Sequence, residues 1–170
     1  FAMAHFQVLL PSSDIVTDNH QTVELTALFT HPMEQGPIMD MGLPKQFGVL
    51  VNGQKENLLP TLQTKKQDGK TFFTTTYSPK RPADYIFFLE PAPYWEAAEG
   101  KMIVHYTKVV LDAFSAEAGW EEAIGLPVEI EPLVRPYGLW TGNLFRGIVK
   151  QEGKPVPFAK IEVEYFNTGK

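Results

Sequence analysis

The chain has 170 residues, enough for one ordinary domain or for one domain and part of a second. Hydrophobic residues make up 44% and charged residues 21%, which is typical of a globular protein and excludes a disordered chain. The net charge of −5, without a basic stretch, argues against nucleic acid as a partner. The longest purely apolar run, residues 85–89, is far shorter than the roughly 20 residues of a membrane-spanning helix, so we expect a protein that is not membrane-embedded.

Cysteine is absent, which excludes disulfides, thiolate metal sites and cysteine nucleophiles. Any metal site must therefore use His, Met, Asp or Glu. At the start of the chain, Ala2-Met3-Ala4 fits the small-x-small pattern that signal peptidase reads. We expect residues 1–4 to be the end of a signal peptide, or to lie beside its cleavage point, in a secreted protein. An arbitrary starting point is the alternative.

Strand patterns dominate the chain. Residues 22–29 alternate between apolar and polar side chains, as expected of a half-buried strand. Residues 47–51 form a second run that ends at Asn52-Gly53, a pair that favours a tight turn. Residues 70–77 are rich in threonine and aromatics, which suit strands. Five further runs have strand character: residues 84–89, 101–111, 128–133, 145–149 and 159–166.

Helix signals are weak by comparison. The best candidate is residues 114–124, with Ser115 as N-cap, but Gly119 in its middle allows only a short helix or a turn. Proline and glycine punctuate the strand runs at spacings typical of an antiparallel sandwich. The sequence therefore predicts an all-β, immunoglobulin-like antiparallel β-sandwich over residues 1–140.

The last thirty residues have a pattern of their own. Residues 147–150 and 156–163 are strand-like and are separated by Gly153-Lys154-Pro155. This pattern resembles the opening hairpin of transthyretin-like and carboxypeptidase-regulatory-like domains. We therefore expect residues 141–170 to be the first strands of a second, transthyretin-like β-domain, incomplete here because two strands alone are marginally stable.

Motifs for enzymatic chemistry are missing from the sequence. It contains no G-x-S-x-G, no phosphate-binding glycine loop, no G-x-G-x-x-G and no H-E-x-x-H. Many carboxylate pairs are conceivable among the Asp and Glu residues, but no pair stands out. We therefore expect a protein that is not an enzyme.

Metal binding has more support from the residue types. His31 opens a Pro- and Gly-rich segment that continues to Met39 and Met41, so imidazole and thioether groups lie within about ten residues. Imidazole suits nickel, cobalt, copper and zinc, and thioether prefers softer ions. The alternative role of the two methionines is to fill gaps under the loop.

Two further histidines are candidate ligands. His5 would become the mature N-terminus if cleavage followed Ala4, and its amine and imidazole could then chelate one ion together. His105 shares the apolar face of its strand, where a histidine is more often a packed core residue than a ligand. His20 lies in a polar segment that we interpret as an exposed turn.

An aromatic and acidic segment follows residues 85–90. Tyr94, Trp95 and Glu96 could dock a partner, because tyrosine and tryptophan anchor interfaces at low entropic cost. A hydrophobic corner that closes the end of the sandwich is the equal alternative.

Four phrases resemble a family of secreted bacterial proteins known as a domain of unknown function: AHFQVLLPS, FTHPMEQGPIMDMGLPKQFGV, EPAPYWEAAEGKMIVHYTKVV and EIEPLVRPYGLWTGNLFRGIV. Its members are often described as periplasmic components of cobalt or nickel ABC-type uptake systems, and in them a transthyretin-like half follows the sandwich. The resemblance covers essentially the whole chain.

The resemblance implies a periplasmic protein that binds nickel or cobalt, with copper or zinc as alternatives, and delivers the ion to a membrane uptake transporter. By the same resemblance the candidate ligands are His5, His31 and His105, followed by Met39 and Met41. Met3 stands where a second histidine would give tighter chelation. Two other functions stay open: an immunoglobulin-like interaction or scaffold module without metal, and a copper oxidase with a histidine brace at His5.

Overall fold

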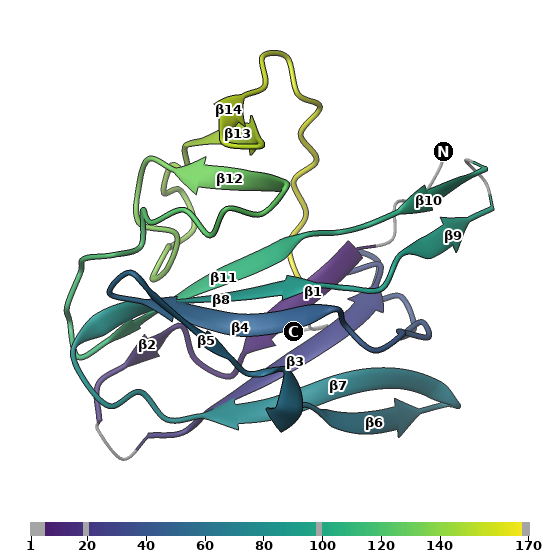
Figure 1. The fold of residues 1–170 in the computed structure, drawn as a ribbon, viewed down its shortest axis with the longest axis horizontal. Helices are drawn as coiled ribbons and strands as arrows, with labels where there is room; N and C mark the ends of the chain where they lie inside the picture. Colours follow the sequence, from purple (N-terminus) through teal and green to yellow (C-terminus); the bar gives the residue numbers. More distant parts are fainter. Residues whose placement is uncertain (1–5, 19–20, 98–99, 168–170) are drawn as a thin grey trace.

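The structure is a computed structural model that describes residues 6–18, 21–97 and 100–167. Within these ranges the regular elements are β-strands and one 3-10 helix, η1 (Leu59–Thr61). The predicted all-β fold is confirmed. Two sheets pack face to face as a β-sandwich, and a smaller sheet stands apart from them (Figure 1).

The first layer is a four-stranded antiparallel sheet. Its strands, in spatial order, are β1 (Phe6–Pro11), β3 (Val23–Thr30), β7 (Lys70–Tyr77) and β6 (Gln63–Gln67). The pattern in β3 follows the predicted alternation, because Val23, Leu25 and Ala27 are almost fully buried between the layers.

The second layer has five strands: β2 (Ile15–Val16), β11 (Thr107–Ala113), β8 (Ala83–Glu90), β4 (Gln46–Val51) and β5 (Gln54–Asn57). All neighbours are antiparallel except β2 and β11, which pair in parallel. Asn52 and Gly53 join β4 to β5 with positive φ angles of 49° and 71°, the turn that the sequence predicts.

The second layer is covered on both faces. Tyr85, Phe87 and Leu89 of β8 face the main core between the layers, whereas Ile86 and Phe88 pack into a second cluster. Ile124, Leu126 and Tyr137 also belong to that second cluster. Burial on both faces explains why residues 85–89 are continuously apolar, since a strand that is exposed on one side would alternate.

The remaining strands project from the sandwich. β9 (Tyr94–Glu96) and β10 (Lys101–Ile103) form a short hairpin. β12 (Val128–Pro132), β13 (Gly147–Gln151) and β14 (Lys154–Pro155) form the third sheet, with β12 and β14 on either side of β13.

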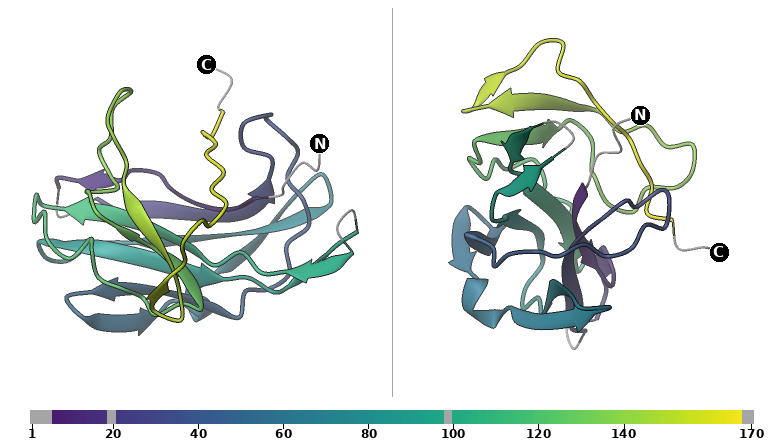
Figure 2. Two further views of the ribbon diagram at one scale, coloured as in Figure 1. Left: turned by 90° about the horizontal axis from the view of Figure 1, so that it is seen from above. Right: turned by 90° about the vertical axis from the view of Figure 1, so that its right-hand side faces the viewer.

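We call residues 128–167 the C-terminal arm. Figure 2 shows from the side that this arm lies outside the two layers. After β14 its chain runs back across the molecule to the loop that follows β3, where the Asn167 backbone N–H donates to the Pro32 carbonyl (3.0 Å). The arm thus pairs β12, from the predicted first domain, with the hairpin assigned to the second. The boundary at residue 140 and the transthyretin-like continuation stay predictions.

Two predicted elements are wrong in detail, and for a third the structure decides between the predicted alternatives. Residues 114–124 contain turns and no helix, because Phe114, Ser115 and Glu117 have positive φ angles of 62°, 57° and 52°. Residues 101–111 are two strands and not one, since β10 pairs with β9 while β11 pairs with β8. Residues 159–166 alternate like a strand but have no strand partner among the described residues.

Candidate functional site

The half-buried side chain of His105 lies between β10 and β11, within a small aromatic group. Its ring centroid is 5.9 Å from that of Phe29, in edge-to-face contact, and 5.6 Å from that of Tyr94. Its Nε2 lies 3.3 Å from the Tyr94 hydroxyl, within hydrogen-bonding distance. This contact orients the imidazole, as a hydrogen bond from outside the coordination sphere does for histidine ligands.

His31 lies just past the end of β3, two residues after Phe29. The Gly36 N–H donates to the His31 carbonyl (3.0 Å) and closes the loop, while Thr30 Oγ1 donates to the Gly36 carbonyl (2.8 Å). A Cβ at Gly36 would stand 2.8 Å from the Cβ of His31, so glycine permits this close approach. Because Phe29 contacts His105, the structure brings the His31 loop and His105 to the same end of the sandwich.

The two candidate methionines pack inward. The Met39 N–H donates to the Phe29 carbonyl (2.9 Å), and the side chain lies partly buried against the main core. Met41 is only 2% exposed and belongs to that core. Both positions suit the packing role of methionine, and their role as ligands stays a prediction.

His5 and His20 lie outside the described residues. In the described ranges, no three His, Asp or Glu side chains gather closely enough to hold a metal ion. A site built from described residues alone would therefore have two imidazoles at most, from His31 and His105. Two ligands leave at least half of a divalent ion's coordination sphere to other groups.

The predicted docking residues divide between two roles. Tyr94 packs inward on Phe29 and His105, with its ring centroid 5.4 Å from that of Phe29. Trp95 points outward, 61% exposed, and pairs across the hairpin with Met102, which is 57% exposed. Glu96 is half-buried on the same strand. The outward face of this hairpin is therefore an apolar pair of side chains.

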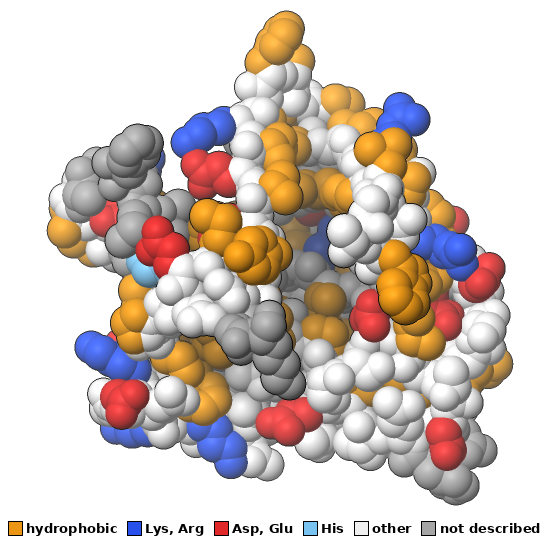
Figure 3. All heavy atoms as spheres, turned by 180° about the vertical axis from the view of Figure 1, so that it is seen from behind, with side chains coloured by type: hydrophobic (Ala, Val, Ile, Leu, Met, Phe, Trp, Pro, Cys, Tyr) orange, Lys and Arg blue, Asp and Glu red, His pale blue; other side chains and the backbone are white. Residues whose placement is uncertain are grey.

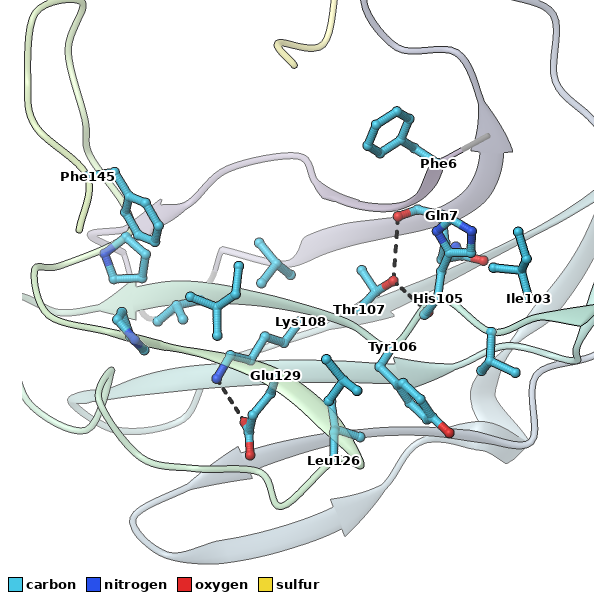
Figure 4. A pocket seen from close by; sticks show the side chains of 17 residues that line it. Phe6, Gln7, Ile103, His105, Tyr106, Thr107, Lys108, Leu126, Glu129 and Phe145 are labelled. Atoms are coloured by element: carbon cyan, nitrogen blue, oxygen red, sulfur yellow. Dashed lines mark hydrogen bonds and ion pairs between the residues drawn. The ribbon is translucent and has the colours of Figure 1, made fainter. Parts of the chain in front are cut away.

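A cleft of about 660 Å³ runs from His105 along β11 and under the C-terminal arm. Figure 4 shows Phe6 and Phe145 on its walls, and Lys108 and Glu129 joined across it. Every residue from 103 to 110 lines the cleft, so it follows the edge of β11 and not one of its faces. Its size is that of a small-molecule site.

The ion pair in the cleft is well shielded from water. Lys108 Nζ lies 2.9 Å from Glu129 Oε2, and the two side chains are 14% and 6% exposed. Glu129 also accepts from the N–H groups of Ile124 and Gly125. Burial by itself would raise the pKa of Glu129, but Lys108 and these two donors hold it below its ordinary value. Glu129 is therefore a carboxylate at neutral pH.

A pair of buried carboxylates lies in the second layer, on the face that is turned away from the first layer. Asp84 and Asp112 stand opposite each other on β8 and β11, and both are almost completely buried. Asp84 Oδ2 accepts from the Tyr137 hydroxyl at 3.3 Å, while Oδ1 has no partner in the described chain. Burial raises the pKa of Asp84 to about 6, and the neighbouring Asp112 carboxylate adds to the rise against the Tyr137 hydrogen bond.

Neither the cleft nor this carboxylate pair was predictable from the sequence. Asp84 and Asp112 lie at the ends of apolar runs, where an aspartate ordinarily marks a turn. Only the pairing of β8 with β11 reveals that they face each other.

Over residues 2–170 the chain matches a family described as a domain of unknown function, DUF4198. The chain belongs to the DUF4198 family. No curated protein matches this DUF4198 chain significantly. Membership of a family of unknown function, which the sequence predicts, is thereby confirmed. The candidate ligands, the β9–β10 hairpin and the whole cleft lie within the matched residues.

The structure also bears on the membrane prediction. None of the helices in the described ranges has the length and apolar character needed to cross a bilayer.

Proposed function

We propose that this DUF4198 protein binds a divalent transition-metal ion, nickel or cobalt, in the periplasm and delivers it to a membrane uptake transporter. The observation that carries the proposal is the contact between Phe29 and His105, which brings the His31 loop and His105 to one end of the sandwich. Strand β1 begins at this same end, because Phe6 pairs with Thr30. His5 precedes Phe6 in the sequence.

In this proposal the ligands are His31, His105 and His5, with Met39 and Met41 as further candidates. The Tyr94 hydroxyl selects the metal-binding nitrogen of His105: when it accepts the proton of Nε2, the lone pair is on Nδ1. Neutral imidazoles bind the ion, so affinity is expected to fall as the pH drops below about 6.5. Passing the ion on requires release, which this pH dependence and the small number of histidines favour.

Calorimetric titration of chelator-stripped protein with nickel, cobalt, copper and zinc at neutral pH tests the proposal. We expect one-to-one binding that weakens on the order of 100-fold in a His31→Ala, His105→Ala double variant. His20→Ala is the matched control, since it removes an imidazole from a segment without other candidate ligands. Full binding by the double variant, or no binding of any ion by folded wild-type protein, would contradict the proposal.

A second candidate function is an interaction module without metal, favoured by the exposed Trp95 and Met102 pair on the β9–β10 hairpin. A photo-crosslinking amino acid at position 95 would then give one discrete product in cells, unchanged by chelator. The same amino acid at Leu43, an equally exposed position on another loop, serves as control. Identical crosslinking patterns from the two positions would argue against such a module.

A further inference from the structure

The edge of β11 that borders the cleft is open along most of its length. β2 occupies this edge only at Asp112 and Ala113, where the Asp112 N–H donates to the Asp14 carbonyl (2.9 Å). Alternate residues of a strand direct both backbone groups to the same edge, so the N–H and carbonyl groups of Lys108 and Val110 point that way too. In the part of the chain that the structure describes, these four groups have no partner. The edge thus offers two donors and two acceptors, the pattern with which another strand pairs.

The open edge is shielded from solvent. Val110 is only 5% exposed, and the side chain of Lys108 is 14% exposed. In Figure 4, Gln7 of β1 lies on one side of Lys108 and Glu129 of β12 lies on the other. Unpaired backbone groups on an open surface bind water, whereas groups in an apolar cleft are costly to leave unpaired. An occupant that pairs with the edge would remove this cost.

The charges in the cleft favour an uncharged occupant. Lys108 Nζ and Glu129 Oε2 lie 2.9 Å apart and neutralise each other, so a further charge beside this shielded pair would have no partner. Gln7 lines the cleft, is 6% exposed and has its Oε1 unpaired within the described residues. An N–H group satisfies such an acceptor, whereas a carboxylate does not. The cleft therefore suits a neutral molecule that has N–H and carbonyl groups.

Hydrophobic side chains line the cleft from two elements. Phe6 comes from β1, and the C-terminal arm supplies Val128, Ile130 and Phe145. Successive side chains of a strand point to opposite faces, so a strand on the edge of β11 would meet apolar groups on both faces. Strands that are covered on both faces have continuously apolar sequences, as β8 does at residues 85–89. The same composition is therefore expected of an added strand.

We propose that the cleft binds a short, uncharged and mainly apolar peptide segment of another protein, in extended conformation, as an added strand on the edge of β11. The segment continues the pairing that β2 begins at Asp112. The open edge, residues 107–111, is about 16 Å long and matches five peptide residues. Backbone hydrogen bonds provide the affinity, and the apolar walls select the side chains. Such binding needs no metal ion, so it goes beyond the proposed function.

Fluorescence anisotropy of the whole chain with a labelled peptide, in the presence of chelator, tests this proposal. The peptide is Thr-Val-Val-Val-Thr with a Gly-Gly-Lys-Lys tail for solubility, and we expect saturable binding. The same peptide with its three valines N-methylated lacks the N–H groups that pair with β11, so it should bind about tenfold more weakly. Equal binding of the two peptides, or no binding of either by the folded chain, would overturn the proposal.

Hydrogen exchange measured by NMR locates the bound peptide. At saturation the amide protons of Lys108 and Val110 should exchange about tenfold more slowly, because they become hydrogen-bonded. The Asp112 amide is an internal control, since it already donates to Asp14 and should change little. Slower exchange elsewhere, with Lys108 and Val110 unaffected, would place the peptide outside the cleft and overturn the proposal.

A narrowed cleft gives a second, independent readout. Val128 lies in β12, lines the cleft and is 41% exposed, so Val128→Trp adds bulk without opening the core. We expect this variant to bind the peptide about tenfold more weakly. Val163→Trp, on the exposed segment of the arm, is the matched control and should bind as the wild type does. Equal effects of the two variants would contradict binding in the cleft.

A second copy of the chain is the other occupant that the experiment must separate. Analytical ultracentrifugation of the whole chain with and without the peptide makes this distinction. We expect a monomer in both samples. A dimer that the peptide dissociates would show that a second copy holds the edge of β11, and would overturn its assignment to another protein.

Discussion

The sandwich and the C-terminal arm carry the same kind of sequence pattern with opposite results. In β3 the alternating Val23, Leu25 and Ala27 are at most 1% exposed, because a second sheet covers them. In the arm, Ile161, Val163 and Tyr165 alternate in the same way and are 57%, 88% and 62% exposed. Figure 3 shows hydrophobic side chains (orange) gathered over the upper part of the molecule, where the arm lies. Alternation therefore marks the capacity to form a strand, and a covering layer decides whether its apolar face is buried.

The largest expected difference between the two regions is in stability. Phe87 is fully buried at the centre of β8, so Phe87→Ala should lower the free energy of unfolding by about 3–5 kcal/mol. Val163→Ala should change it by less than about 0.5 kcal/mol, because Val163 is exposed. Urea unfolding followed by tryptophan fluorescence measures both. A cost of several kcal/mol for Val163→Ala would show that the arm is packed in solution in a way that the structure does not contain.

The next largest loss of stability is expected when the ion pair between the sandwich and the C-terminal arm is broken. Glu129 lies in the arm and Lys108 in the sandwich, so Glu129→Gln leaves a largely buried ammonium without its carboxylate. We expect a loss of about 2–4 kcal/mol in the same unfolding measurement.

A double variant, Lys108→Met with Glu129→Met, should recover most of that loss, since it removes both charges. The control is Lys160→Met in the exposed pair with Glu162, which should have almost no effect. If the double variant is as unstable as Glu129→Gln, the backbone contacts of Glu129 matter more than its charge.

A smaller effect is the pH dependence of stability, which should differ in sign between a buried and an exposed carboxylate. Asp84 holds its proton up to a pH of about 6 in the folded chain, against an ordinary pKa of 3.8. Between these values the folded state binds more protons than the unfolded state, so its contribution to stability falls as the pH rises through that window. Asp84→Asn should remove this slope and stabilise the protein at pH 7.5, on the order of 1 kcal/mol.

The exposed Asp40 should contribute to the pH dependence of stability with the opposite sign. The Thr71 N–H donates to its Oδ1 (2.8 Å) and holds the pKa of Asp40 below the ordinary value. Its contribution is therefore present at neutral pH and is lost as the pH falls through its folded pKa. Urea midpoints between pH 3 and pH 7.5 for Asp84→Asn and Asp40→Asn should diverge in these opposite directions. Parallel profiles would mean that Asp84 is ionised throughout.

Much of the sandwich was predictable because its strands carry their own signals. β7 has the predicted bounds, and β3 and β4 begin within one residue of them. β5 and β6 were missed, since every residue in them is exposed and polar, so neither alternation nor β-propensity marks them. They form because tight turns fold them back onto β4 and β7.

The site was less predictable, because it depends on contacts between distant segments. His105 and the His31 loop were candidates by residue type alone, and the contact between Phe29 and His105 places them at the same end of the sandwich. For Tyr94 the sequence left two roles open, partner docking and a hydrophobic corner; its ring packs on His105, and Trp95 keeps the outward position. Sequence spacing has no information on such contacts, since strand order decides them.

The parallel pairing of β2 with β11 has a consequence for the order in which the chain can fold. Ile15 pairs with Asp112, so roughly 100 residues separate the partners, and closing so long a loop costs conformational entropy before any contact is gained. During synthesis or translocation, the first strands have emerged long before β11 is available. Until then their edge is exposed, and we expect completion of the second layer to be the slow step, on the millisecond-to-second scale of long-range β-pairing. The sheet edge that lines the cleft is thus made of the strand that the nascent chain supplies last to this layer.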